Sequence, residues 1–122
     1  NGRTILGDEM MILMSRSILK TNPGGKIVGD VKCSDRLYKD VERNGGKPIM
    51  WKTGHSRIKS KMLETGADIG GEMSGHIFFN DRWYGFDDAI YASARLLEIV
   101  SKDQRPVSEI FRSFPNSFNT PE

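Results

Sequence analysis

The chain has 122 residues, which is enough for one domain with its own core and too few for two well-packed domains. With 37% hydrophobic and 28% charged residues, its composition is typical of a soluble globular protein and excludes the disordered and fibrous classes. The net charge of +2 suits a small anionic ligand, and no basic run of the kind that binds nucleic acid accompanies it.

A first helix is predicted over residues 8–20, with Asp8 as its N-cap and apolar side chains largely on one face. Its apolar run is far too short to cross a bilayer, and the acidic Asp8 and Glu9 precede it, so no signal peptide is predicted. The chain starts at Asn1 and ends shortly after a proline-containing stretch, so both ends are expected to belong to a longer protein.

Two strand–helix units follow, offset by about 21 residues. In the first, the strand KIVGDV leads to a helix capped by Ser34 that stops at Gly45. In the second, the strand KPIMWK leads to a helix with Ser56 as its cap and Gly66 at its end. The single cysteine, Cys33, excludes an internal disulfide and indicates a reducing cytoplasm. It is interpreted as a buried, inert thiol, with a nucleophile as the alternative.

A third strand over residues 67–71 completes a strand–helix–strand–helix–strand order, which predicts a parallel sheet with right-handed crossovers. HIFFN (76–80) and RWYGF (82–86) are predicted to pair as a hairpin that adds an antiparallel edge. The predicted fold class is therefore a three-layer α/β/α sandwich with a mostly parallel, mixed sheet of about four strands.

Two helices are predicted after the hairpin. The longer one is capped by Asp87 or Asp88 and runs to about Ser101, with its core face formed by Ile90, Tyr91, Ala94, Leu97 and Val100. Binding of a hard cation is the alternative interpretation of the Asp87-Asp88 pair. Pro106 opens a short final helix, and Pro115 begins an extended exit.

The stretch GGEMSGHIFF (70–79) is the most unusual local pattern. In an extended segment Glu72, Ser74 and His76 would point the same way and converge on one ligand, while the glycines would let that ligand approach the backbone. The alternative is a glycine-rich turn in which Glu72 caps a neighbouring group.

Polar residues follow each of the three predicted parallel strands. Lys32 follows the first and His55 the second, and Glu72 and Ser74 follow the third. Ligands of open α/β sheets bind outside the carboxyl ends of the strands, so we expect these side chains to form one site. Carboxylate and hydroxyl groups suit sugar hydroxyls, and Lys and His⁺ favour phosphate, which indicates a phosphorylated sugar. Zinc-ligand spacing, a nucleotide-binding P-loop and a dinucleotide fingerprint do not occur.

GEMSGH, followed by IFF, RWYGFDD and a helix, resembles the third, sugar-binding domain of the α-D-phosphohexomutase family, in its bacterial phosphomannomutase/phosphoglucomutase branch. DVKCS and MWKTGHS resemble two other loops of that domain, so the resemblance covers essentially the whole chain. It implies one α/β domain over residues 1–115 and the start of a linker to the next domain at 116–122.

The resemblance also implies an activity. The family are isomerases, intramolecular phosphotransferases that interconvert hexose 1-phosphate and 6-phosphate through a bisphosphorylated intermediate. By the resemblance, Glu72 and Ser74 read the sugar hydroxyls, and Lys32 and His55 line the same cleft. His76 matches a family histidine proposed for proton transfer, work that suits an imidazole.

Three family loops are absent from this sequence: the phosphoserine loop, the DGDGDR magnesium loop and the phosphate-binding loop of the fourth domain. The resemblance therefore implies that Mg²⁺ is held outside this fragment, that the fragment holds no metal, and that it is inactive alone. A glucose 1,6-bisphosphate-type activator, a phosphorylated hexose, the other three domains and a cytoplasmic location are further expectations, with no nucleic-acid or membrane partner.

The preferred hexose phosphate is left open. Phosphoglucosamine mutases tend to have Gln where Met73 stands, and a phosphoglucosamine mutase domain is one alternative. A non-catalytic α/β binding module that kept the scaffold is the other.

Overall fold

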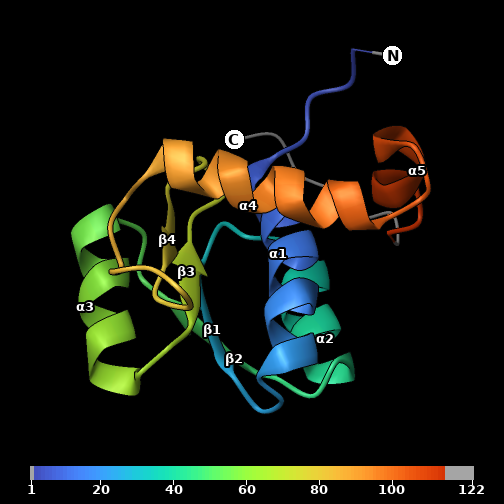
Figure 1. Cartoon of the computed structure of the whole chain (residues 1–122). Coiled ribbons are helices and arrows are strands. Elements are labelled where there is room, and N and C mark those ends of the chain that lie inside the picture. Colours follow the sequence, from blue (N-terminus) through green and yellow to red (C-terminus); the bar gives the residue numbers. More distant parts are fainter. Residues whose placement is uncertain (1, 115–122) are drawn as a thin grey trace.

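A four-stranded mixed sheet with helices on both faces forms the protein in our computed structural model, which describes residues 2–114 (Figure 1). Within these residues the strands are β1 (Lys26–Asp30), β2 (Lys47–Trp51), β3 (Ile69–Gly71) and β4 (Ile77–Phe79). The helices are α1 (Gly7–Thr21), α2 (Asp35–Arg43), α3 (His55–Thr65), α4 (Ala89–Lys102) and α5 (Val107–Arg112).

The strand order is β2-β1-β3-β4, with β1 parallel to both of its neighbours and β4 antiparallel to β3. Val28 is in register with Ile49 on one side and Gly70 on the other, and Gly70 is in register with Phe78. The predicted mostly parallel sheet with an antiparallel edge is confirmed.

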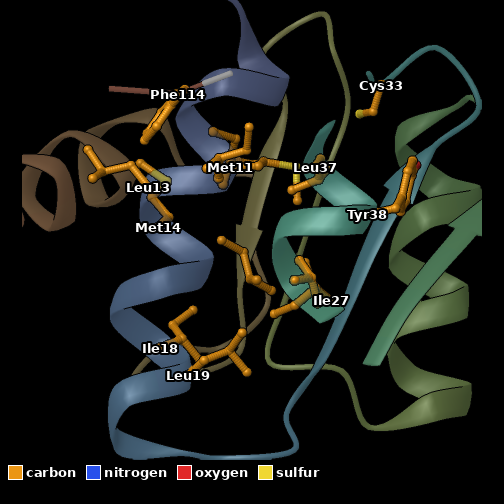
Figure 2. Packing of buried hydrophobic residues seen from close by; sticks show 14 of the residues in the cluster. Met11, Leu13, Met14, Ile18, Leu19, Ile27, Cys33, Leu37, Tyr38 and Phe114 are labelled. Carbon is orange, nitrogen blue, oxygen red and sulfur yellow. The ribbon is translucent and has the colours of Figure 1, made fainter. Parts of the chain in front are cut away.

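Alternate side chains of the strands enter two separate cores, as the pleat of a sheet requires. Val28 and Phe78 pack with Ile58 and Met62 of α3 on one face. The larger core on the other face joins α1, α2, α4 and α5 to the sheet. Figure 2 shows this core around α1, α2 and β1, with the labelled side chains Met11, Leu13, Met14, Ile18, Leu19, Ile27, Cys33, Leu37, Tyr38 and Phe114.

The first helix starts one residue earlier than predicted, and Asp8 is not its N-cap. Leu6 occupies the cap position without a side-chain hydrogen bond. The buried carboxylate of Asp8 instead accepts hydrogen bonds from the backbone N–H of Ser34, at 2.8 Å, and of Glu9, at 2.9 Å. The Asp8 carboxylate therefore binds a tertiary partner on the loop after β1 and does not cap the helix.

The ends of α2 and α3 agree only in part with the predicted caps. Ser34 caps α2 by accepting from Arg36 N at 3.2 Å, and Gly66 ends α3 in the left-handed region with φ 71°. However, α3 begins at His55, with Gly54 in the cap position, so Ser56 lies inside the helix and the prediction of its capping role was wrong.

The predicted hairpin between residues 76–80 and 82–86 was wrong. β4 pairs with β3, and the only pairing between β4 and the following segment among the described residues is a single bridge from Phe78 to Asp87. The chain turns sharply at Arg82 and Gly85, with φ 59° and 75°, so 82–86 cannot extend as a strand. The loop 72–76 is therefore itself the hairpin connection.

The long helix α4 is confirmed, with Asp88 as its N-cap accepting from Tyr91 N at 2.9 Å. Its predicted core face was wrong, because Ile90 and Leu97 are 86% and 68% exposed. The buried side of the helix includes Arg95, whose guanidinium forms an ion pair with Asp81 at 2.9 Å and lies 4.6 Å from the centre of the Phe79 ring. This polar contact lies beside Ala92 and Leu96, which pack in and against the core on the same side of α4.

The short helix α5 is confirmed, and it buries Ile110 and Phe111. The predicted exit at Pro115 and the linker at 116–122 lie outside the described residues. No helix among residues 2–114 has the length and apolar character needed to cross a membrane.

Candidate functional site

Three loops meet at the carboxyl edge of the sheet, where β1, β2 and β3 end. They consist of residues 31–34, 52–54 and 72–76. Because the three strands are parallel, their carboxyl ends lie at one edge, which is where ligands of open α/β sheets bind.

Glu72 joins the loop after β3 to the loop after β2. Its side chain is buried, with 3% of the residue exposed, and Oε1 accepts a hydrogen bond from the backbone N–H of Gly54 at 2.7 Å. Gly54 directly precedes α3, so this carboxylate holds the start of the helix against the 72–76 loop. The alternative interpretation, in which Glu72 caps a neighbouring group, is correct for this oxygen.

The 72–76 loop is a tight turn and not an extended segment. Glu72 N donates to the carbonyl of His76 at 2.9 Å, and Gly75, at φ 106°, donates its N–H to the carbonyl of Glu72 at 3.0 Å. Glu72 therefore points inward while Ser74 and His76 are exposed. The premise that all three side chains point the same way was wrong.

His55 and His76 come together from two different loops. Their ring centroids are 5.9 Å apart, and the rings are tilted by 34°. His76 Nδ1 lies 2.7 Å from Oδ2 of Asp87, and the two side chains are 49% and 37% exposed. This arrangement is an accessible imidazole with a carboxylate partner, which is suited to moving a proton.

Asp30, at the end of β1, joins the loops after β1 and β2. Its buried carboxylate accepts from the N–H and the Sγ–H of Cys33, both at 3.1 Å, and from Oγ1 of Thr53 at 3.2 Å. Burial and the neighbouring Asp30 raise the pKa of the Cys33 thiol, so it stays protonated at neutral pH. The interpretation of Cys33 as a buried thiol is confirmed.

Lys32 and Ser74 are exposed on the loops where the sequence placed them. Ser74 lines a groove of about 380 Å³ between the start of α1 and α4, together with residues that include Met10, Met73 and Ser93. Within residues 2–114, no hydrogen bond joins Lys32 or Ser74 to either histidine. The structure therefore brings His55, Glu72 and His76 together at their loops and leaves Lys32 and Ser74 around them.

Three residues of this edge were not predicted as site residues from the sequence: Asp30, Thr53 and Asp87. Asp87 was predicted as one of two possible caps of the following helix. Because a helix needs only one cap, the pair Asp87-Asp88 was a signal that one of the two carboxylates had another partner. Asp30 was read only as part of a strand, although a charged residue at the buried end of a strand needs hydrogen-bond donors. In the described part of the chain, no three His, Cys, Asp or Glu side chains are grouped so that they could hold a metal ion.

Comparisons with a family model and with known proteins all indicate the same family. The family model for phosphoglucomutase/phosphomannomutase, alpha/beta/alpha domain III, matches residues 6–118. A phosphomannomutase/phosphoglucomutase of Pseudomonas aeruginosa is 53% identical over 121 residues, which cover 99% of this chain and 26% of that protein. A phosphoglucomutase of Neisseria meningitidis serogroup A is 50% identical over 122 residues, covering all of this chain and 26% of the relative.

A solved structure has the same fold. The crystal structure of a phosphoglucomutase/phosphomannomutase family protein from Burkholderia thailandensis superposes with a TM-score of 0.93 at 50% sequence identity. The match covers 98% of this chain and 26% of that one. The chain thus spans about a quarter of the length of the relatives it matches.

Proposed function

This chain belongs to the phosphoglucomutase/phosphomannomutase family as its alpha/beta/alpha domain III, and from this premise we propose that it is the sugar-recognition domain of a phosphohexomutase. The whole enzyme would interconvert hexose 1-phosphates and 6-phosphates through a bisphosphorylated sugar. The names of the relatives support this assignment, and they span both phosphomannomutases and phosphoglucomutases.

The observation that carries the proposal is the junction of the loops at one sheet edge. Glu72 binds Gly54 across two loops, Asp30 binds Thr53 across two loops, and the rings of His55 and His76 lie 5.9 Å apart. Hydrogen bonds accepted by the buried carboxylates of Asp30 and Glu72 hold a binding surface in a fixed arrangement before the ligand arrives. A fixed polar rim supports recognition of a small polar ligand better than it supports a flat protein interface.

We assign the roles of the exposed residues from their chemistry. Ser74 would bind a sugar hydroxyl, and Lys32 and His55 would attract the phosphate. His76 would exchange a proton with a sugar hydroxyl. Glu72 would contribute a carboxylate oxygen to the sugar only through Oε2, since Oε1 already accepts from Gly54.

The metal and the phosphoryl carrier would come from outside this chain. We propose that the Mg²⁺ and the phosphoserine of the full enzyme belong to its other three domains, since the loops that carry them in the family do not occur in this sequence. We also propose residues 1–115 as one domain and 116–122 as the start of a linker. The activator would be a sugar bisphosphate such as glucose 1,6-bisphosphate. The single buried thiol, Cys33, is compatible with a cytoplasmic location.

Amide chemical shifts of the chain, recorded during titration with glucose 1-phosphate or mannose 1-phosphate, test this proposal. We expect sugar-phosphate-specific shifts at Lys32, His55 and residues 71–76, and much smaller ones with free mannose or inorganic phosphate. Ser74→Ala should weaken the response while leaving the remaining spectrum unchanged, because Ser74 is exposed. Shifts that cluster away from these loops would contradict the placement of the site.

One domain of a multidomain cleft offers only some of the contacts that bind a ligand, so weak affinity is expected. If millimolar sugar phosphate causes no shifts, the decisive measurement is turnover by the full-length enzyme carrying Ser74→Ala. Unchanged kcat/KM in that variant would refute the role of Ser74.

A further inference from the structure

The His76–Asp87 pair joins the residue before β4 to the segment before α4, 11 residues further along the chain. His76 directly precedes β4, and Asp87 directly precedes Asp88, the N-cap of α4. The bridge between Phe78 and Asp87 fixes one backbone against the other. Both ends of the 2.7 Å contact between His76 Nδ1 and Asp87 Oδ2 are therefore positioned by the fold.

An ionised carboxylate only accepts hydrogen bonds, so a neutral imidazole that faces it must carry its proton on Nδ1. The lone pair of the ring is then on Nε2. We propose that Asp87 is a positioning residue: it fixes the tautomer and orientation of His76 so that Nε2 is the proton acceptor at the sugar site. The proposal rests on the proposed function, in which His76 faces the substrate.

The side chain of Asp87 contributes little to holding the fold together. Its side chain and that of His76 are 37% and 49% exposed, and ion pairs in such positions contribute little to folding. Asp88, and not Asp87, caps α4. Within residues 2–114, the contact to His76 is the only hydrogen bond made by the Asp87 carboxylate.

The surroundings of the pair fit proton transfer. A proton that leaves a sugar hydroxyl would pass to Nε2, and the electron pair of the O–H bond would stay on the hydroxyl oxygen. The imidazolium that results would face the Asp87 carboxylate, which stabilises it. The ring of His55 lies next to the ring of His76, at 5.9 Å between centroids.

The ¹⁵N shifts of the histidine ring nitrogens in the 122-residue chain, recorded where the rings are neutral, test the proposal. In the parent, His76 should show a protonated Nδ1 and an unprotonated Nε2. In Asp87→Ala no acceptor faces Nδ1, so the proton is no longer held there and the shifts of the two ring nitrogens should move towards each other, as in a ring that exchanges between its tautomers. Asp88→Asn is the matched control: it removes the same charge one residue away, keeps a good N-cap and should leave the tautomer unchanged.

A parent His76 with its proton on Nε2 would overturn the proposal, and so would an Asp87→Ala chain in which Nδ1 stays protonated as in the parent. The parent spectrum suffices for the first outcome even if the variant does not fold. In the full-length enzyme, Asp87→Ala should lower kcat with little change in KM, since it acts through His76 and not on the bound sugar. The expected tautomers, found together with unchanged kcat/KM in the full-length Ser74→Ala enzyme, would count against the proposed function and leave the positioning role of Asp87 intact.

Discussion

The carboxylate of Glu72 lies in the interior of the protein and makes a charge-assisted hydrogen bond to Gly54 N at 2.7 Å. Replacement by alanine would leave the half-buried N–H of Gly54 without its carboxylate partner. We expect Glu72→Ala to lower the free energy of unfolding by about 1–3 kcal/mol, measured by urea denaturation. The loss of a binding response in this variant would therefore not by itself show that Glu72 touches the sugar.

Ser74→Ala is the control for this prediction, because Ser74 is exposed on the same loop. It should change the free energy of unfolding by no more than about 0.5 kcal/mol. Equal stability of Glu72→Ala and Ser74→Ala would show that the contact to Gly54 does not hold the loops together.

At the level of elements, the start of α1 packs directly on the 72–76 loop. Gly7 N donates to the carbonyl of Met73 at 3.2 Å, and a Cβ at Gly7 would lie 2.8 Å from that oxygen and still closer to the carbonyl of Glu72. Helix propensity favours alanine over glycine by about 1 kcal/mol. We nevertheless expect Gly7→Ala to destabilise the chain by about 1–3 kcal/mol, because backbone atoms would have to move.

Lys20→Ala, at an exposed position in the last turn of α1, is the comparison variant and should change stability by no more than about 0.5 kcal/mol. A Gly7→Ala chain more stable than the parent would mean that intrinsic propensity outweighs the close approach. Urea midpoints of the three chains decide between the two outcomes.

At the level of the whole molecule, two buried groups couple stability to alkaline pH. Burial raises the pKa of both the Cys33 thiol and the Tyr38 phenol, whose ordinary values are about 8.5 and 10. Above these values the unfolded chain releases protons that the folded chain keeps, so the folded state is disfavoured as pH rises. We expect the free energy of unfolding to be insensitive to these groups at neutral pH and to fall above about pH 8.5.

The measurement is the urea midpoint from neutral pH to about pH 10.5. Cys33→Ala should flatten the decline between about pH 8.5 and 10, since it removes the first group to titrate. The same decline in Cys33→Ala as in the parent would contradict this assignment.

Three helix ends that depend on local capping signals were predicted correctly. Ser34, Gly66 and Asp88 act where the sequence placed them, because a cap interacts with groups only a few residues away. The edge where the candidate site lies followed from the order of the elements alone, because parallel strands place their carboxyl ends together.

Other predictions failed where a distant partner replaced a local one. The Asp8 carboxylate does not cap α1 but accepts a hydrogen bond from the N–H of Ser34, 26 residues away. The buried side of α4 includes Arg95, which binds Asp81, 14 residues away. Neither contact leaves a periodic or capping signal in the sequence.

The sequence by itself determined the α/β order of elements, the sheet type and the loops that carry the candidate site, since these depend on periodicity, caps and chain order. Only the tertiary structure decided that Glu72 points inward to Gly54, that β4 pairs with β3 and not with 82–86, and that His76 meets Asp87. The Glu72–Gly54 and His76–Asp87 contacts join different loops, and the pairing of β4 is a choice between two neighbouring segments that the local pattern does not separate. These contacts stabilise the protein only once the sheet has brought the segments together.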